Sequence, residues 1–161
     1  MIVLGVDPGL ASLGWGVVRS ERGRLSHVAH GVLTTKAGTP PEERLKFLYD
    51  EIQALVQQFS PEQAALEKLY FMKNVSSALP VAEVRGVLLL AFAQAQLAVG
   101  QYDPTQIKSA VVGVGKAEKH QVQEMIRFLL SLPEIPRPDH AADALAVAVC
   151  HLHRSLLCGI A

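Results

Sequence analysis

The chain has 161 residues, of which 50% are hydrophobic, so it carries enough apolar material for the core of a single domain spanning residues 1–161. Its 15 lysines and arginines equal its 15 aspartates and glutamates, a balance that lacks the basic footprint expected of a nucleic-acid binder. The longest apolar stretch, 87–93, is far shorter than the roughly 20 residues of a membrane-spanning helix, and no signal peptide is recognisable, so we expect a cytoplasmic protein without a membrane segment.

The N-terminal part of the chain predicts three strands. Residues 2–7 form a continuous apolar run that is stopped by a proline and a glycine, which places Asp7 at the C-terminal end of a strand. Residues 14–19 and 25–35 predict two further strands, joined by a turn at residues 21–23. Together the three strands are expected to form an antiparallel meander.

The next segment predicts a helix followed by a strand. Residues 41–59 carry apolar side chains at helical spacing and charged side chains between them, which is typical of an amphipathic helix packed on a sheet. Residues 63–69 predict a buried strand in which Glu67 is the only acid.

A second helix is expected over residues 76–97. Pro80 moves its expected start to near Leu79, because proline is tolerated in the first turn of a helix but breaks its interior. The later half is apolar on almost every side, and one side would leave an apolar patch in water unless a second copy covered it. We therefore expect a two-fold homodimer, with Leu88 or Leu89 facing the partner.

The C-terminal part predicts a short strand at 99–103, helices from about Pro104 and over 116–132, and a last helix from about Asp139. Three strands followed by alternating helices and strands are typical of an α/β fold. We expect a mixed five-stranded sheet with the antiparallel meander at one side, flanked by helices.

Three acids stand out by their positions. Asp7 ends the first strand, Glu67 lies inside an apolar strand, and Asp143 lies among alanines on the last helix, with His140 and Asp139 on the same helical face. Each has a plainer explanation: Glu67 could form a structural ion pair, Asp7 could cap a turn, and Asp143 could be a surface acid. If the three converge, their carboxylates repel one another unless a cation lies between them.

Magnesium suits such a cluster, because it is a hard ion that prefers oxygen ligands and water. Two ions about 4 Å apart would hold the attacking water and the leaving oxygen of a phosphodiester. The acids therefore favour metal-dependent phosphodiester hydrolysis.

Several motifs are spread over nearly the whole chain. They are Gly5-Val6-Asp7-Pro8-Gly9, Ala65-Leu66-Glu67, Met72-Lys73-Asn74, Ser77-Ala78-Leu79, Arg85-Gly86-Val87, Gln106-Ile107-Lys108, Val112-Gly113-Val114-Gly115, Ala117-Glu118-Lys119-His120-Gln121-Val122 and Ala141-Ala142-Asp143-Ala144-Leu145-Ala146. With these motifs the sequence resembles the RuvC-type Holliday junction resolvases. The resemblance implies an RNase H-like fold, a homodimer, paired symmetric nicks in four-way junction DNA, and a branch-migration complex as partner.

The resemblance also assigns roles to particular residues. The fourth acid of the family is His140 here, with Asp139 as the fallback ligand, and Lys119 matches a family lysine near the scissile phosphate. Two Mg²⁺ per subunit are implied, with Mn²⁺ as a substitute. The implied metal ligands are Asp7, Glu67, His140 and Asp143, and the implied DNA contacts are Tyr70, Lys73, Arg85, Lys108 and Lys116.

Three other functions stay open from the sequence. Asp7-Pro8-Gly9 with Gly14 and Gly16 resembles the phosphate loop of sugar-kinase or actin-like ATP-binding modules. A non-catalytic junction-binding protein is the second, because histidine replaces an acid at position 140. A general RNA-degrading or RNA-processing nuclease of the same fold is the third.

Overall fold

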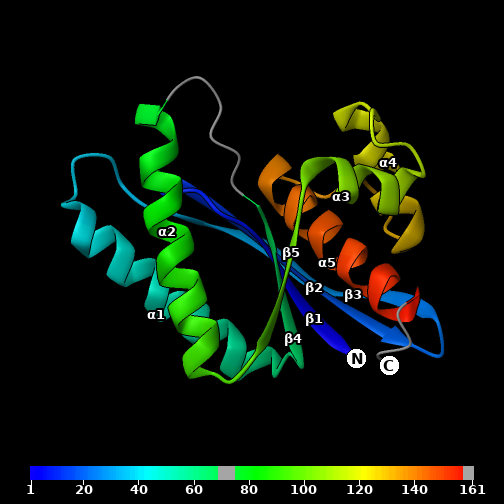
Figure 1. Ribbon diagram of the computed structural model, residues 1–161, viewed down its shortest axis with the longest axis horizontal. Helices are drawn as coiled ribbons and strands as arrows, with labels where there is room; N and C mark the ends of the chain where they lie inside the picture. Colours follow the sequence, from blue (N-terminus) through cyan, green and yellow to red (C-terminus); the bar gives the residue numbers. More distant parts are fainter. Residues whose placement is uncertain (69–74, 158–161) are drawn as a thin grey trace.

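The computed structural model describes residues 1–68 and 75–157. In this part of the chain five strands form one mixed sheet in the order β3-β2-β1-β4-β5 (Figure 1). The pairs β1–β2 and β2–β3 are antiparallel, and the pairs β1–β4 and β4–β5 are parallel. The predicted five-stranded sheet with its antiparallel meander is therefore confirmed. The strands are β1 (Ile2–Asp7), β2 (Ser12–Glu21), β3 (Arg24–Thr34), β4 (Gln63–Glu67) and β5 (Ala98–Tyr102).

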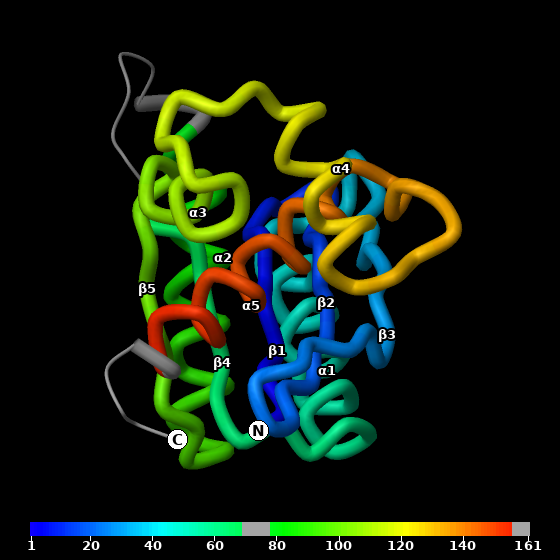
Figure 2. Tube along the Cα trace, turned by 90° about the vertical axis from the view of Figure 1, so that its right-hand side faces the viewer, coloured from blue at the N-terminus to red at the C-terminus, as the bar shows by residue number. Residues whose placement is uncertain are grey.

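Helices cover both faces of this sheet (Figures 1 and 2). One face carries α1 and α2, and the other carries α5 with α3 and α4 beside it. Alternation along β1 supplies both layers: Val3 belongs to the core under α5, whereas Leu4 belongs to the core under α1 and α2. The helices are α1 (Pro41–Phe59), α2 (Val75–Gln94), α3 (Pro104–Val112), α4 (Lys119–Leu129) and α5 (Asp139–Leu157).

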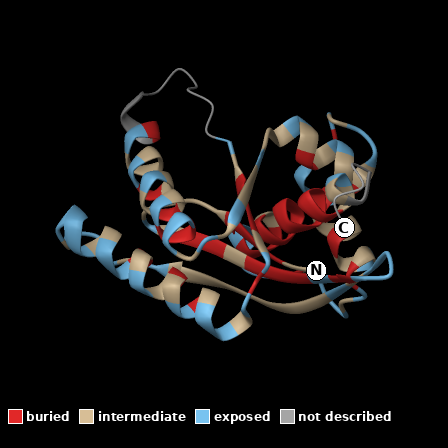
Figure 3. Ribbon diagram, turned by 60° about the horizontal axis from the view of Figure 1, so that its bottom comes forward, coloured by how far each residue is buried: buried red, intermediate tan, exposed pale blue. Residues whose placement is uncertain are grey.

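Helix α5 is buried at nearly every position of its central part, as the red ribbon in Figure 3 shows. It lies directly on β1 and β2 because both strands present glycine to it. A Cβ on Gly14 would lie 1.9 Å from the backbone oxygen of His140, and a Cβ on Gly5 would lie 2.2 Å from that of Ala144. These glycines therefore let the backbone of α5 approach the sheet more closely than any side chain would allow.

Helix α2 begins at Val75 and contains Pro80, so the expected start near Leu79 was wrong. Helical stability comes mainly from packing of a buried face, which here includes Val84 and Phe92, and this packing offsets the hydrogen bond that proline removes. Leu88 is also fully buried in the chain's own core, so it does not face a partner. Within the described residues, no helix is both long enough and apolar enough to cross a membrane.

A buried histidine joins α5 to two strands. His151 of α5 donates from Nε2 to the side-chain oxygen of Gln63 on β4, and its Nδ1 accepts a hydrogen bond of 2.8 Å from the hydroxyl of Tyr102 on β5. Gly100 leaves room for the ring, since a Cβ there would lie 2.2 Å from Nδ1. Both ring nitrogens are thus satisfied with His151 neutral, and burial lowers the pKa of His151.

Candidate functional site

The C-terminal ends of β1 and β4 bring the first two acids together. The strands are parallel neighbours with Val6 opposite Leu66, and each ends one residue later, at Asp7 and Glu67 respectively. The side chain of Asp7 is only 17% exposed. Two carboxylates from distant parts of the sequence therefore lie side by side at one edge of the sheet.

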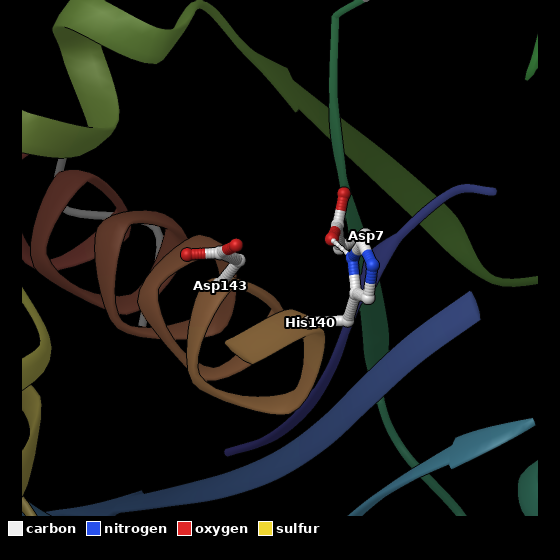
Figure 4. A group of neighbouring side chains, drawn as sticks. All are labelled: Asp7, His140 and Asp143. Carbon is white, nitrogen blue, oxygen red and sulfur yellow. Dashed lines mark hydrogen bonds and ion pairs between the residues drawn. The ribbon is translucent and has the colours of Figure 1, made fainter. Parts of the chain in front are cut away.

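The N-terminal part of α5 adds His140 and Asp143 to this edge (Figure 4). The imidazole Nδ1 of His140 lies 2.7 Å from Oδ2 of Asp7. Asp7, His140 and Asp143 each offer one ligand atom, and these atoms all lie within 4.8 Å of one another. Two carboxylate oxygens and an imidazole nitrogen at this separation fit a divalent cation. Glu67, the fourth predicted ligand, is not part of this group, and its role as a ligand stays a prediction.

Burial perturbs the titration of both strand-end acids. Burial and, to a smaller extent, the neighbouring carboxylates of Asp7 and Asp143 together raise the pKa of Glu67 to about 7. Burial also raises the pKa of Asp7, against the hydrogen bond from His140, which lowers it. The raised pKa values of Asp7 and Glu67 mark an environment in which a bound cation would relieve the repulsion between carboxylates.

Lys119, the first residue of α4, lies against the α5 acids. Its Nζ is 3.0 Å from Oδ2 of Asp143 and 3.2 Å from Oδ2 of Asp139. Burial lowers the pKa of Lys119, but the two carboxylates outweigh this effect and raise it, so the ammonium stays charged. Asp139 also accepts a hydrogen bond from Gln123. Asp139 therefore pairs with Lys119. His140, and not Asp139, belongs with Asp7 and Asp143 to the group that could hold a metal ion.

A pocket of about 240 Å³ opens beside these acids. Glu67 and Asp143 line one part of it, and Lys108 of α3 and Lys119 of α4 line another. Acidic and basic side chains therefore face the same hollow, which suits a phosphodiester approaching a cation from the lysine side. The second predicted DNA contact in this region, Lys116, is exposed in the segment between α3 and α4.

Arg85 occupies a position that the sequence did not reveal. From α2, its Nη1 donates to the backbone oxygen of Glu67 and its Nη2 donates to the side-chain oxygen of Gln101 at 2.7 Å. It thereby ties α2 to the end of β4, where a candidate ligand is carried. Contact between Arg85 and DNA stays a prediction, and the predicted contacts Tyr70 and Lys73 lie outside the described residues.

Comparison with known proteins places these residues in a family. A sequence model described as crossover junction endodeoxyribonuclease RuvC matches residues 3–151. The chain belongs to the RuvC family. It is 52% identical to the crossover junction endodeoxyribonuclease RuvC of Chloroflexus aggregans over 95% of this chain and 93% of that protein.

Solved RuvC structures have the same fold. Thermus thermophilus RuvC superposes with a TM-score of 0.90 at 34% identity, covering 98% of this chain and 96% of that one. The same RuvC in complex with a Holliday junction substrate superposes with a TM-score of 0.93 at 35% identity and the same coverage. The predicted RNase H-like fold is confirmed by these matches.

Proposed function

We propose that this chain is an endonuclease that cuts four-way junction DNA by metal-dependent hydrolysis of phosphodiester bonds. The observation that carries the proposal is the convergence of Asp7, His140 and Asp143 within 4.8 Å, from a strand and a helix that are far apart in sequence. The RuvC relatives are named crossover junction endodeoxyribonucleases, which supports hydrolysis of DNA as the reaction. Thermus thermophilus RuvC was solved in complex with a Holliday junction substrate, which supports four-way junction DNA as the substrate.

We propose that two Mg²⁺ ions are held by Asp7, Glu67, His140 and Asp143. When bound, such ions supply an activated water and charge stabilisation at the scissile phosphate. Asp7 and Glu67 keep their positions because both end buried parallel strands. His140 keeps its position because the backbone of its helix turn rests on Gly14. An imidazole nitrogen suits Mn²⁺ better than Mg²⁺, so Mn²⁺ is expected to substitute well.

Lys119 has a distinct role in this proposal. Its ammonium already lies 3.0 Å from Asp143 and shares a pocket with Glu67, so it stands between the acids and an incoming phosphate. A fixed positive charge there would stabilise the negative charge that develops on the phosphoryl oxygens during hydrolysis. Lys108, which lines the same pocket, would position the DNA backbone without reading its sequence.

We also propose that two copies pair through α2. Leu79 and Leu90 are each 55% exposed, and Gly86 is exposed on the same helical face. A second α2 would cover this stripe, and a two-fold arrangement would hold two metal sites in fixed relation, as paired nicks require. A branch-migration complex stays a further expected partner, from the resemblance alone.

The test is incubation of the protein with an end-labelled synthetic four-way junction, with and without Mg²⁺, followed by mapping of the products. We expect paired nicks in two strands of like polarity that require the metal, and little cutting of linear duplex or of RNA–DNA hybrid. Binding without any metal-dependent cutting would instead support the non-catalytic junction-binding protein. Preferential cutting of the hybrid would support the general nuclease.

A further inference from the structure

A second pocket, of about 320 Å³, lies where β3 ends and α1 begins. Its walls carry two cations, Lys36 and Arg44, one acid, Glu43, and a partly exposed aromatic ring, Phe47. Three threonines complete the lining: Thr34, Thr35 and Thr39. Guanidinium, ammonium and hydroxyl groups gathered in one hollow are the groups that bind backbone phosphates in protein–DNA complexes.

Arg44 is fixed in this pocket by a chain of hydrogen bonds. Its Nε donates to the hydroxyl oxygen of Thr35 at 2.7 Å, and that hydroxyl donates to the backbone oxygen of Leu10 at 2.6 Å. Among the described residues, neither Nη atom of Arg44 nor Nζ of Lys36 has a hydrogen-bond or ion-pair partner. The guanidinium is therefore oriented by one nitrogen and keeps the N–H donors of its other two nitrogens available to a ligand.

The pocket lies at the same end of the sheet as the candidate metal site. The strand β3 runs parallel to β1, with β2 between them, so Thr34 and Asp7 both lie at C-terminal strand ends on one edge. Two strand spacings place β1 and β3 about 10 Å apart. Phosphates at about this separation lie within a few nucleotides of one another on one DNA strand. Leu10, three residues after Asp7, links the two regions directly.

We propose that this pocket, formed around Lys36, Arg44 and Thr35, binds a DNA backbone phosphate a few nucleotides from the phosphate that is cut. It lies beyond β2 from Asp7, whereas Lys108 and Lys119 lie on the opposite side of the acids, so the substrate strand is held on both sides of the metal site. The inference rests on the proposed function for the identity of the substrate. Free inorganic phosphate has the same chemistry and is tested as an alternative occupant.

The test uses Lys36→Ala and Arg44→Gln, with Lys46→Ala as the matched control. Lys46 lies on the same helix as Arg44, but it is highly exposed and pairs with Asp50. Junction affinity is measured by fluorescence anisotropy in EDTA, to prevent cutting, over a salt series from about 50 to 200 mM. Each pocket variant is expected to weaken binding for all junction sequences and to lower the salt slope by about 1, with Lys46→Ala unchanged.

Phosphate-ethylation interference then locates the contact. In the wild type, ethylation a few nucleotides from the cut should reduce binding, and in Lys36→Ala the same ethylation should have little further effect. Salt slopes and ethylation patterns of both pocket variants equal to those of the wild type would overturn the proposal. So would inorganic phosphate binding to the pocket while DNA does not.

Failure of the proposed function gives a different result. If the wild type neither cuts nor prefers a junction, the same variants are compared on linear duplex DNA. A reduced salt slope there supports the phosphate site without the resolvase activity, and an unchanged slope overturns the site as well.

Discussion

The replacement of Gly14 by alanine tests how the sheet positions α5, the helix that carries His140 and Asp143. The new Cβ would lie 1.9 Å from the backbone oxygen of His140, and contacts under 3.0 Å are essentially never found, so α5 must move by at least about 1.1 Å. His140 Nδ1 and Asp7 Oδ2 are only 2.7 Å apart, so a shift of that size separates the two candidate ligands. A misplacement of about 1 Å can cost about 100-fold in rate.

The assay is single-turnover cutting of a labelled four-way junction at saturating protein, together with calorimetric titration of Mn²⁺. We expect Gly14→Ala to cut about 100-fold more slowly and to bind Mn²⁺ more weakly, with junction affinity retained. The control is Gly23→Asn, because Gly23 has φ 78° in the β2–β3 turn, open space around it, and a conformation that asparagine tolerates. A folded Gly14→Ala protein with wild-type cutting and Mn²⁺ binding would refute the positioning argument.

Three further predictions concern Arg85, His151 and Leu90. Arg85→Met should weaken Mn²⁺ binding and cutting, because Arg85 holds the backbone of Glu67 in place. Its junction affinity should stay near that of the wild type. Loss of junction affinity with unchanged cutting would instead make Arg85 the phosphate contact predicted from the sequence. Burial lowers the pKa of His151 below its ordinary 6.5, so the unfolded chain binds more protons than the folded chain just below that pH. The excess stability of the wild type over His151→Gln in urea unfolding should therefore be full above about pH 6.5 and shrink as pH falls, and a constant difference would contradict this. Leu90→Glu should convert the proposed dimer to monomer in sedimentation and abolish paired nicking. The control Phe128→Glu, at a position 74% exposed on α4, should leave the proposed dimer intact. A dimeric Leu90→Glu protein would exclude α2 as the interface.

The sequence predicted those features that depend on local pattern. The apolar run before Asp7 gave the end of β1 correctly, whereas β4 ends at Glu67, two residues before the expected end at residue 69. The three-residue spacing of His140 and Asp143 placed both on one helical face. Residues 41–59 gave the bounds of α1 as the structure has them. These features follow from strand and helix periodicity, which a single sequence carries.

Features that depend on contacts between distant segments could not be predicted in the same way. Gly14 and Gly16 resembled a phosphate loop, yet they accommodate α5, and only the pairing of α5 with β2 reveals this. Apolar residues occur on most sides of α2, so the sequence did not indicate which side faces the core. Leu88 was therefore a candidate for the interface, although it is fully buried. A helix that is apolar on most sides has little directional pattern to identify its buried face.

The contacts of charged side chains were equally hidden. Arg85 was assigned as a DNA contact by resemblance, and only the fold shows that its guanidinium donates to the backbone carbonyl of Glu67. Lys119 was assigned near the phosphate by resemblance, and the structure adds that it pairs with Asp139 and Asp143. Long flexible side chains reach several partners from one backbone position, so sequence spacing alone does not select among them.

We propose that the acids around Asp7 hold the metal that DNA cutting requires, while other groups bind the junction. The direct test compares cutting and binding of one labelled four-way junction by the wild type and by Asp7→Asn, at equal Mg²⁺. We expect Asp7→Asn to bind the junction with affinity near that of the wild type and to produce no nicks, because junction binding uses phosphate contacts elsewhere on the surface. Near-normal cutting by folded Asp7→Asn would contradict the assignment of this cluster as the nuclease site.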